Sequence, residues 1–441
     1  MRMLCLKLKI LALKENGRHI LYGVLTEALA LKQAAVMVLI TVLMCTVLQI
    51  HSHVMERSGY NCRAVLLSMC SLVIVMSCVH KAENKDVDII CPLSATKEVY
   101  ELDKYIRDVQ VIPIVSDSLI FSGISKMIVS DKRYIILSGG VVFSVSFDGR
   151  SVCRIGNVGR GPGEYLSVKD IAINVYNDEI WCLDILNEVL RYDLQSGKYI
   201  DSCEQDENGY ATAIIPLDNN SFALYFPNPR DEDLTKRHVK FYSYREYDSD
   251  GNILNQGMPW NEFALETNFV QPLSYTADSC SVFASGSSDP IVVYKHGHIR
   301  EKIKLDFGIY NVPENYFKSR SINPYILAEQ LFEQDYFKLV SSVYILGNDI
   351  YFQAFGKQSS SWNFYFERGT DKGIRWRAVP TAGPPQNAIG SDGEYLYYEY
   401  ESLGRFSMSE EQDPLMRALL KRYGQLMEEA NNYIIKLKIQ L

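Results

Sequence analysis

The sequence predicts an all-β fold, and its repeats indicate a six-bladed β-propeller with a short C-terminal helix and a helical insertion between blades 4 and 5. The first observation is a series of tight-turn glycines at intervals of 48, 54 and 46 residues: Gly149, Gly197, Gly251 and Gly297. Hairpin turns need positive φ, which glycine supplies. The second is a set of polar turns, each followed by a strand-like run. The third is the content of 29 tyrosines and 18 phenylalanines, which favours strands.

The polar turns mark the early strands of each unit. They are Asp131-Lys132, Asn177-Asp178, Asn219-Asn220, Asn348-Asp349 and Asp392-Gly393. A period of roughly 40–55 residues with about four strands is typical of a propeller blade. The blades are predicted near residues 118–157, 164–205, 209–257, 270–308, 335–379 and 386–440.

Two helices interrupt this pattern. Residues 309–334 are predicted to be an insertion whose short helix includes Ile326 to Leu331. A second helix is predicted over residues 413–430, where apolar residues recur at helical spacing and Pro414 suits the first turn.

The two ends of the propeller sequence are predicted to close one sheet. Residues 108–114 are strand-like but have no blade of their own, and the chain ends in a strand-like run at residues 433–439. Pairing these runs would hide sheet edges that otherwise invite aggregation.

The segment before the propeller contains an export signal. Val75-Met76-Ser77-Cys78 resembles a bacterial lipobox, and the apolar run 64–77 preceding Cys78 has the length of a signal-peptide core. With Arg57 and Arg63 as its positive flank, residues 55–77 are predicted to be a lipoprotein signal peptide. Cys78 is the predicted lipidation site, residues 78–97 a tether, and residues 98–441 the propeller.

Residues 1–54 have two interpretations. Translation could start at Met55, which would make the upstream part a spurious extension. Alternatively, the apolar run 34–50 is a genuine membrane helix near the lower length limit for spanning a bilayer. Either reading places the protein in the cell envelope, on the periplasmic face or the cell surface.

Charge argues against nucleic-acid binding. Residues 1–77 carry eight Lys/Arg and three Asp/Glu, so the whole-chain charge of −8 leaves −13 for the rest. Nucleic-acid affinity rests on Lys and Arg that neutralise phosphates. The ten cysteines contain no CxxC, and their wide spacing fits neither a zinc site nor a dense disulfide framework.

Candidate ligand-binding residues lie in two segments. The glycine loop 156–163 matches no phosphate-binding pattern, and Pro162 removes an N–H donor, but Arg160 and Glu164 at its rim are candidate ligand contacts. Asp184 and Asn187 are candidates at the mouth of the central channel, although this Asp-x-x-Asn spacing also caps turns.

One segment carries a family resemblance. The run Gly156-Asn157-Val158-Gly159-Arg160-Gly161-Pro162-Gly163-Glu164-Tyr165 leads to Val168-Lys169-Asp170-Ile171, and Asp184, Asn187, Val189 and Tyr192-Asp193 follow. Together these resemble the six-bladed propeller lipoproteins of Bacteroidetes, which are related to NHL-repeat propellers. The resemblance covers about residues 98–441 and implies a fold and an envelope location, while the family's biochemical role is undefined. The chain departs from the pattern in blades 4 and 5.

Two functions remain open. The first is a lipid-anchored binding or scaffold module for a protein, peptide or glycan, since a propeller holds its loops on a stiff framework. The alternative is a lactonase-like metal-dependent hydrolase or lyase with a site in the central channel. Three or more Asp, Asn, Glu or His side chains converging there would favour the enzyme. No catalytic residue, metal ligand or cofactor is predicted, with calcium as the ion left open; the pair His296 and His298 at a hairpin tip is a weak metal-site candidate.

Overall fold

The structure is a computed structural model in which the chain divides between residues 84 and 85 into two compact units. The described residues all belong to the second unit, so the predicted signal peptide, Cys78 and the extension 1–54 lie outside them. They are 87–115, 121, 123–204, 209–226, 242–259, 274–275, 280–283, 290–295, 298–313, 330–331, 333–337, 339–356, 360–378, 388–401, 414–423 and 432–441.

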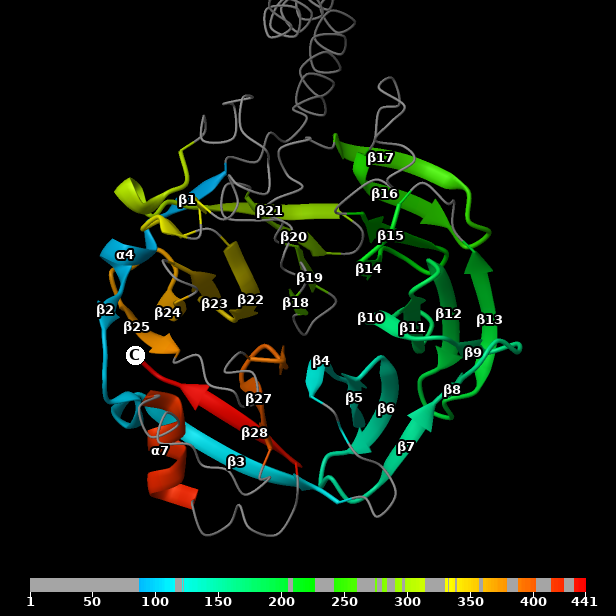
Figure 1. Cartoon of the computed structure of the whole chain (residues 1–441), viewed down its shortest axis with the longest axis horizontal. Helices are drawn as coiled ribbons and strands as arrows, with labels where there is room; N and C mark the ends of the chain where they lie inside the picture. Colours follow the sequence, from blue (N-terminus) through cyan, green and yellow to red (C-terminus); the bar gives the residue numbers. More distant parts are fainter. Residues whose placement is uncertain are drawn as a thin grey trace, which may run out of the picture. The chain divides into compact units, whose positions relative to one another are not determined.

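Six antiparallel sheets form the blades of a propeller, which confirms the predicted fold class (Figure 1). Blade 1 consists of β4 (Ile124–Val129), β5 (Arg133–Ser138), β6 (Val141–Ser146) and β7 (Val152–Ile155). Blade 2 consists of β10 (Val168–Asn174), β11 (Glu179–Asp184), β12 (Glu188–Asp193) and β13 (Tyr199–Glu204). Blade 3 consists of β14 (Ala213–Pro216), β15 (Ser221–Tyr225), β16 (Tyr242–Asp248) and β17 (Ile253–Pro259).

The second half of the ring repeats this order. Blade 4 contains β18 (Ser274–Tyr275), β19 (Cys280–Phe283), β20 (Ile291–Lys295) and β21 (His298–Leu305). Blade 5 contains β22 (Leu339–Leu346), β23 (Asp349–Phe355), β24 (Ser361–Glu367) and β25 (Gly373–Ala378). Blade 6 contains β26 (Gly390–Ser391), β27 (Leu396–Glu401), β28 (Asn432–Ile439) and β3 (Ile106–Ile114). The innermost strands β26, β4, β10 and β14 follow one another around the ring axis.

The turns form where the glycine series predicted them. Gly149, Gly197 and Gly251 all have positive φ, and the fourth glycine of that series lies outside the described residues. In the first of these turns the Asp148 carboxylate accepts hydrogen bonds from the Ser146 hydroxyl and the Arg150 N–H. An aspartate that caps its own turn in this way stabilises the reversal locally.

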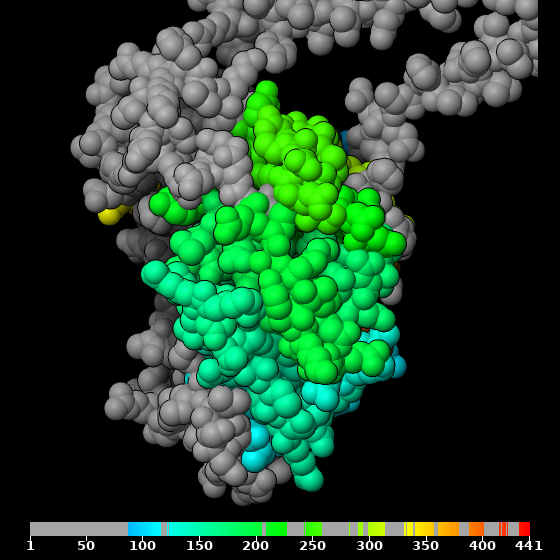
Figure 2. Space-filling view, turned by 90° about the vertical axis from the view of Figure 1, so that its right-hand side faces the viewer, coloured from blue at the N-terminus to red at the C-terminus, as the bar shows by residue number. Residues whose placement is uncertain are grey.

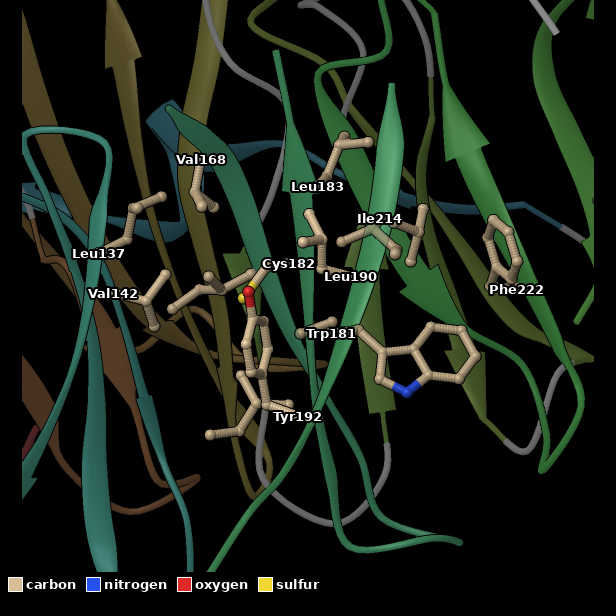
Figure 3. Packing of buried hydrophobic residues seen from close by; sticks show 14 of the residues in the cluster. Leu137, Val142, Val168, Trp181, Cys182, Leu183, Leu190, Tyr192, Ile214 and Phe222 are labelled. Atoms are coloured by element: carbon tan, nitrogen blue, oxygen red, sulfur yellow. The ribbon is translucent and has the colours of Figure 1, made fainter. Parts of the chain in front are cut away.

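Hydrophobic side chains fill the spaces between neighbouring blades. Strand β11 is buried on both faces because blades 1 and 3 flank it. Figure 3 shows Leu137 and Val142 of blade 1 on one side of blade 2, and Trp181 turned toward Phe222 of blade 3 on the other. The Trp181 and Phe222 rings meet edge to face with centroids 5.4 Å apart, a favoured aromatic geometry.

The N-terminal part of the described chain, residues 87–115, wraps the outer edges of three blades and is here called the belt (Figure 1). Its strand β1 (Asp88–Ile90) adds in parallel to β21, and β2 (Lys97–Glu98) adds in parallel to β25. Helix α4 (Pro92–Ala95) and the single turn η1 (Leu102–Lys104) connect them to β3. Strand β3 pairs antiparallel with β28, which confirms the predicted closure by residues 108–114.

The belt begins earlier than the predicted boundary at residue 98. Asp88–Ile90 and Lys97, which the sequence places in the tether, form sheet edges. These strands are two or three residues long and pair in parallel without a hairpin turn. They therefore lack both the turn residues and the strand-like runs that predict the blade strands.

Helix α7 (Pro414–Tyr423) occupies the predicted 413–430 segment and starts at Pro414. The predicted insertion begins with the turn η3 (Gly308–Tyr310), and most of its expected helix at residues 326–331 lies outside the described residues. Within the described part of the chain, no helix has the length and apolar content needed to cross a membrane.

Candidate functional site

The glycine loop forms a closed connection between blades 1 and 2. Its short strands β8 (Asn157–Val158) and β9 (Glu164–Tyr165) pair in parallel. The Glu164 carboxylate accepts a hydrogen bond of 2.8 Å from the Gly161 N–H, and the Glu164 N–H donates back to the Gly161 carbonyl at 2.9 Å. Glu164 therefore binds both backbone groups of Gly161 within the loop.

The glycines of this loop leave room for that arrangement. A Cβ atom on Gly159 would lie 2.0 Å from Glu164 Oε2, far inside any real contact distance. Gly163 has a φ of +73°, and a Cβ there would lie 2.6 Å from the Tyr199 ring. Glycine is the residue that fits such a close approach. The Gly-Arg-Gly-Pro-Gly-Glu run is thus explained by packing between blades 1 and 2.

Tyr165 fastens the end of the loop to blade 1. Its hydroxyl donates to the Ile155 carbonyl at 2.8 Å and accepts from the Val142 N–H at 3.2 Å. Burial raises the pKa of Tyr165 to about 12, because the phenolate would lose its hydration. Arg160 is exposed at the rim, whereas Glu164 is half-buried.

Asp184 and Asn187 are buried in the turn between β11 and β12. The Asp184 carboxylate accepts hydrogen bonds from the Leu166 N–H, at 2.9 Å, and from the Leu186 N–H. Asn187, with a φ of +67°, donates to the Gly209 carbonyl at 2.5 Å and accepts from the Ala211 N–H at 2.8 Å. Both side chains are at most 1% exposed, which matches the turn-capping role of this spacing.

Three of the four candidate ligand-binding residues use their side chains to form hydrogen bonds with backbone groups of the fold. Glu164 shapes the loop, Asp184 binds the amide two residues after Glu164, and Asn187 ties the next turn to blade 3. Arg160 takes no part in these hydrogen bonds. Ligand contact by any of the four stays a prediction.

The two buried caps hold exposed side chains that the sequence analysis did not single out. Leu186 is 62% exposed between the caps, and Tyr210 is 54% exposed between the backbone partners of Asn187. Lys169 Nζ lies 5.3 Å from the Tyr210 ring centroid and donates to the Ala211 carbonyl at 3.1 Å. We call Leu186, Tyr210 and Lys169 the blade 2 platform.

A chain of buried polar contacts links the inner strands below this platform. Lys126 Nζ on β4 lies 2.6 Å from Asp170 Oδ1 on β10, and Asp170 Oδ2 accepts from the Ile214 N–H on β14 at 2.9 Å. Burial lowers the pKa of Lys126 and raises the pKa of Asp170, because each charge leaves water; the partner's opposite charge counteracts both shifts.

These charged groups connect blades and do not gather at one point. Glu399 on β27 accepts from the Ile124 N–H at 2.7 Å, so it joins blade 6 to blade 1. In the described part of the chain, no group of three His, Cys, Asp or Glu residues is arranged to hold a metal ion. The side chains of His296 and His298 lie outside the described residues. Cys91, Cys153 and Cys182 carry free thiols.

Comparison with known proteins identifies a family but no activity. The family model described as a domain of unknown function, DUF4934, matches residues 87–438. No curated protein matches the sequence. Among solved structures, a candidate exported protein of Bacteroides fragilis is 16% identical with a TM-score of 0.62, covering 78% of this chain and 98% of that one. A DUF4221 family member from Bacteroides vulgatus is 12% identical with a TM-score of 0.45, covering 76% and 97%.

Proposed function

This chain belongs to the DUF4934 family, and we propose that it is an exported, lipid-anchored β-propeller that acts as a binding or scaffold module. Its ligand would be a protein, a peptide or a glycan, held at the blade 2 platform. The export signal predicted before Cys78 supports the location, as does the likeness of the fold to a candidate exported protein of Bacteroides fragilis.

The observation that carries the proposal is the rigid presentation of exposed apolar groups. Leu186 and Tyr210 are both more than half exposed, yet the backbone on either side of them is fixed by buried Asp184 and Asn187. Preorganised groups lose little conformational entropy on binding. Tyrosine is moreover enriched at interfaces because its ring offers large contact area together with a polar end.

The platform also has mixed chemistry. Lys169 packs over the Tyr210 ring at 5.3 Å, so one small surface offers an aromatic face, an aliphatic group and a positive charge. An aromatic face and a polar edge suit a sugar ring or the side chains of a peptide.

The test is a screen of the purified protein against glycan and peptide arrays, followed by titration of each hit with Tyr210→Ala. We expect the affinity to fall at least about tenfold, the size of loss seen for aromatic residues central to an interface. Tyr100→Ala is the matched control, since Tyr100 is 71% exposed on the belt. A ligand whose affinity is unchanged by Tyr210→Ala and Leu186→Ser would place the binding site elsewhere and contradict the proposal for this platform.

A further inference from the structure

We propose that the outer face of blade 4 is a membrane-docking surface that lies against anionic lipid headgroups. This face consists of Val87 and Ile89 from the belt together with Ile299, Lys302 and Lys304 from β21. The proposal rests on the proposed lipid anchor and goes further, because it assigns which edge of the propeller faces the bilayer. Figure 1 shows β1 and β21 side by side at the edge of the ring.

The register of β1 and β21 places Ile89 and the two lysines on one face. Ile89 pairs with Lys304 in the parallel ladder between β1 and β21, and paired residues point to the same side. Ile303 and Leu305 alternate with the lysines and are buried toward blade 5. The lysines therefore lie on the side toward blade 3, where Val292, the pairing partner of Lys302, is buried, and they are exposed at the outer edge of the blade. Val293 of β20 pairs with Glu301 of β21, but the next residue, Tyr294, pairs with Ile299. This bulge in β21 brings Ile299 to the same side as Lys302.

The exposed side chains combine aliphatic and basic groups. Val87 is 40% exposed, Ile89 is 62% exposed and Ile299 is 41% exposed. Arg300 and Lys304 are exposed as well, and Lys302 is half-buried. This pairing of apolar and basic groups is what peripheral membrane surfaces use, with aliphatic groups entering the interface and cations meeting anionic lipids.

Two acidic groups nearby, Asp306 and Glu301, are occupied within the fold. The Asp306 carboxylate accepts from the Gly308 N–H and the Asn311 side chain, and these bonds, with the charge of Lys304, lower the pKa of Asp306. Glu301 points to the opposite face of β21, where it pairs with Arg368 at 2.6 Å. The outward face of β21 therefore keeps its basic character.

Chain length argues for a bilayer as the occupant. Eight residues lie between Cys78 and Val87, and the nine Cα–Cα steps that join the two positions span at most about 30 Å when fully extended. An acyl group on Cys78 would hold this edge near the membrane. A single acyl chain gives only marginal membrane binding, so a second contact by a basic, apolar surface adds substantially to anchoring.

The test uses the acylated chain in vesicles with and without phosphatidylglycerol, prepared with brominated acyl chains. A tryptophan is introduced by Ile89→Trp or, as a matched control on the outer strand of blade 2, by Ile200→Trp. Ile200 is 45% exposed, and Figure 2 looks onto that side of the ring. We expect the anionic vesicles to quench the added fluorescence of Ile89→Trp but not that of Ile200→Trp.

Charge reversal separates docking from anchoring. Adding Lys302→Glu and Lys304→Glu should lower the equilibrium constant for docking by at least about 25-fold, because each of the two lysines near an anionic surface contributes about fivefold. The control pair Lys132→Glu and Lys198→Glu changes the net charge equally at exposed turns of blades 1 and 2 and should have no effect.

Each negative outcome has its own meaning. A protein that does not float with vesicles at all refutes the lipid anchor and the docking face that rests on it, whereas ligand binding at the blade 2 platform keeps its own affinity test. A protein that floats but shows equal quenching for Ile89→Trp and Ile200→Trp refutes only the docking face. Concentration-dependent self-association that buries position 89 without vesicles would assign this face to a second copy of the chain and overturn the proposal.

Discussion

Single residues in the interblade loop show how steric room and polar satisfaction depend on each other. Gly159 leaves the space that the Glu164 carboxylate needs to reach the Gly161 N–H. Tyr165 then fixes the loop to two backbone groups of blade 1. A ligand-binding interpretation of Glu164 must therefore account for a carboxylate already engaged with the backbone.

Gly159→Ala should lower the free energy of unfolding by about 1–3 kcal/mol, because the new Cβ displaces the Glu164 carboxylate and the Gly161 N–H loses its charged acceptor. Urea denaturation followed by circular dichroism measures this loss. Gly257→Ala is the control: its Cβ would meet Tyr244 at an ordinary 3.6 Å, and alanine there restricts the unfolded chain. Equal stability for the two variants would show that the loop adapts.

The raised pKa of Tyr165 predicts that the free energy of unfolding falls at high pH. Its pKa is raised from 10.0 to about 12 by burial, so below pH 10 both folded and unfolded chains hold the proton and its contribution is complete. Between about pH 10 and 12 only the unfolded chain releases this proton, and stability falls as the pH rises. Tyr165→Phe should be about 1–3 kcal/mol less stable at neutral pH, since two backbone groups lose their partner.

The same variant should lose less stability than the wild type when unfolding is repeated at increasing pH above 10. Other buried tyrosines titrate in both proteins, so the comparison isolates position 165. An identical slope in both proteins would mean that the Tyr165 hydroxyl does not titrate differently on unfolding.

Buried polar groups connect the strands of neighbouring blades, in addition to apolar packing. Lys126 on β4, Asp170 on β10 and the amide of Ile214 on β14 form one chain of contacts across three innermost strands. The three positions are 44 residues apart, so the contacts repeat with the blade. Such contacts fix the blades in register around the axis.

Lys126→Met should destabilise the protein by about 3–5 kcal/mol, because Asp170 keeps a buried charge and loses this counter-ion. Adding Asp170→Asn should recover most of that loss, since a neutral amide oxygen can still accept from the Ile214 N–H. Lys132→Met at an exposed turn is the control and should change stability by less than about 0.5 kcal/mol. A double variant no more stable than the single one would show that packing of the lysine chain matters more than charge.

Sequence patterns reveal the elements that repeat and miss those that occur once. Gly149 and its equivalents identify the hairpins because each turn needs positive φ. Strand β1 has three residues and no turn of its own, so its pairing with β21 depends on the assembled ring. Likewise, Asp184 and Asn187 stand out as polar residues, but only the fold shows that they are buried and that Leu186 and Tyr210 are the groups presented to solvent.

The whole molecule is asymmetric because the belt covers the outer edges of blades 4, 5 and 6. Blades 4 and 5 each gain a parallel fifth strand, and β3 supplies the outer strand of blade 6. The outer strands β7, β13 and β17 of blades 1 to 3 have no such cover in the described residues. The proposed membrane side and the binding platform thus lie on blades with different edge structure, with blade 4 toward the lipid and blade 2 carrying the ligand surface.

The ring closes where the belt meets blade 1. Ile112 on β3 pairs with Ile434 of β28 and is only 8% exposed, packed into the cluster that blades 6 and 1 share. Three residues further along the chain, the Val115 N–H donates to the Gly149 carbonyl of blade 1 at 3.0 Å. Ile112→Asp places a charge in this closure and should cost more than about 3 kcal/mol, through lost burial and charge desolvation together.

Gln110→Asp is the matched control. It introduces the same charge on the same strand, but at an exposed position. Chemical denaturation followed by tryptophan fluorescence compares the two. If closure by β3 couples the blades, Ile112→Asp lowers the midpoint for the whole ring in a single transition, since every blade depends on its neighbours for its buried faces. A separate early transition with the remaining signal unchanged would instead mean that blade 6 opens alone and that the other five blades stay folded without it.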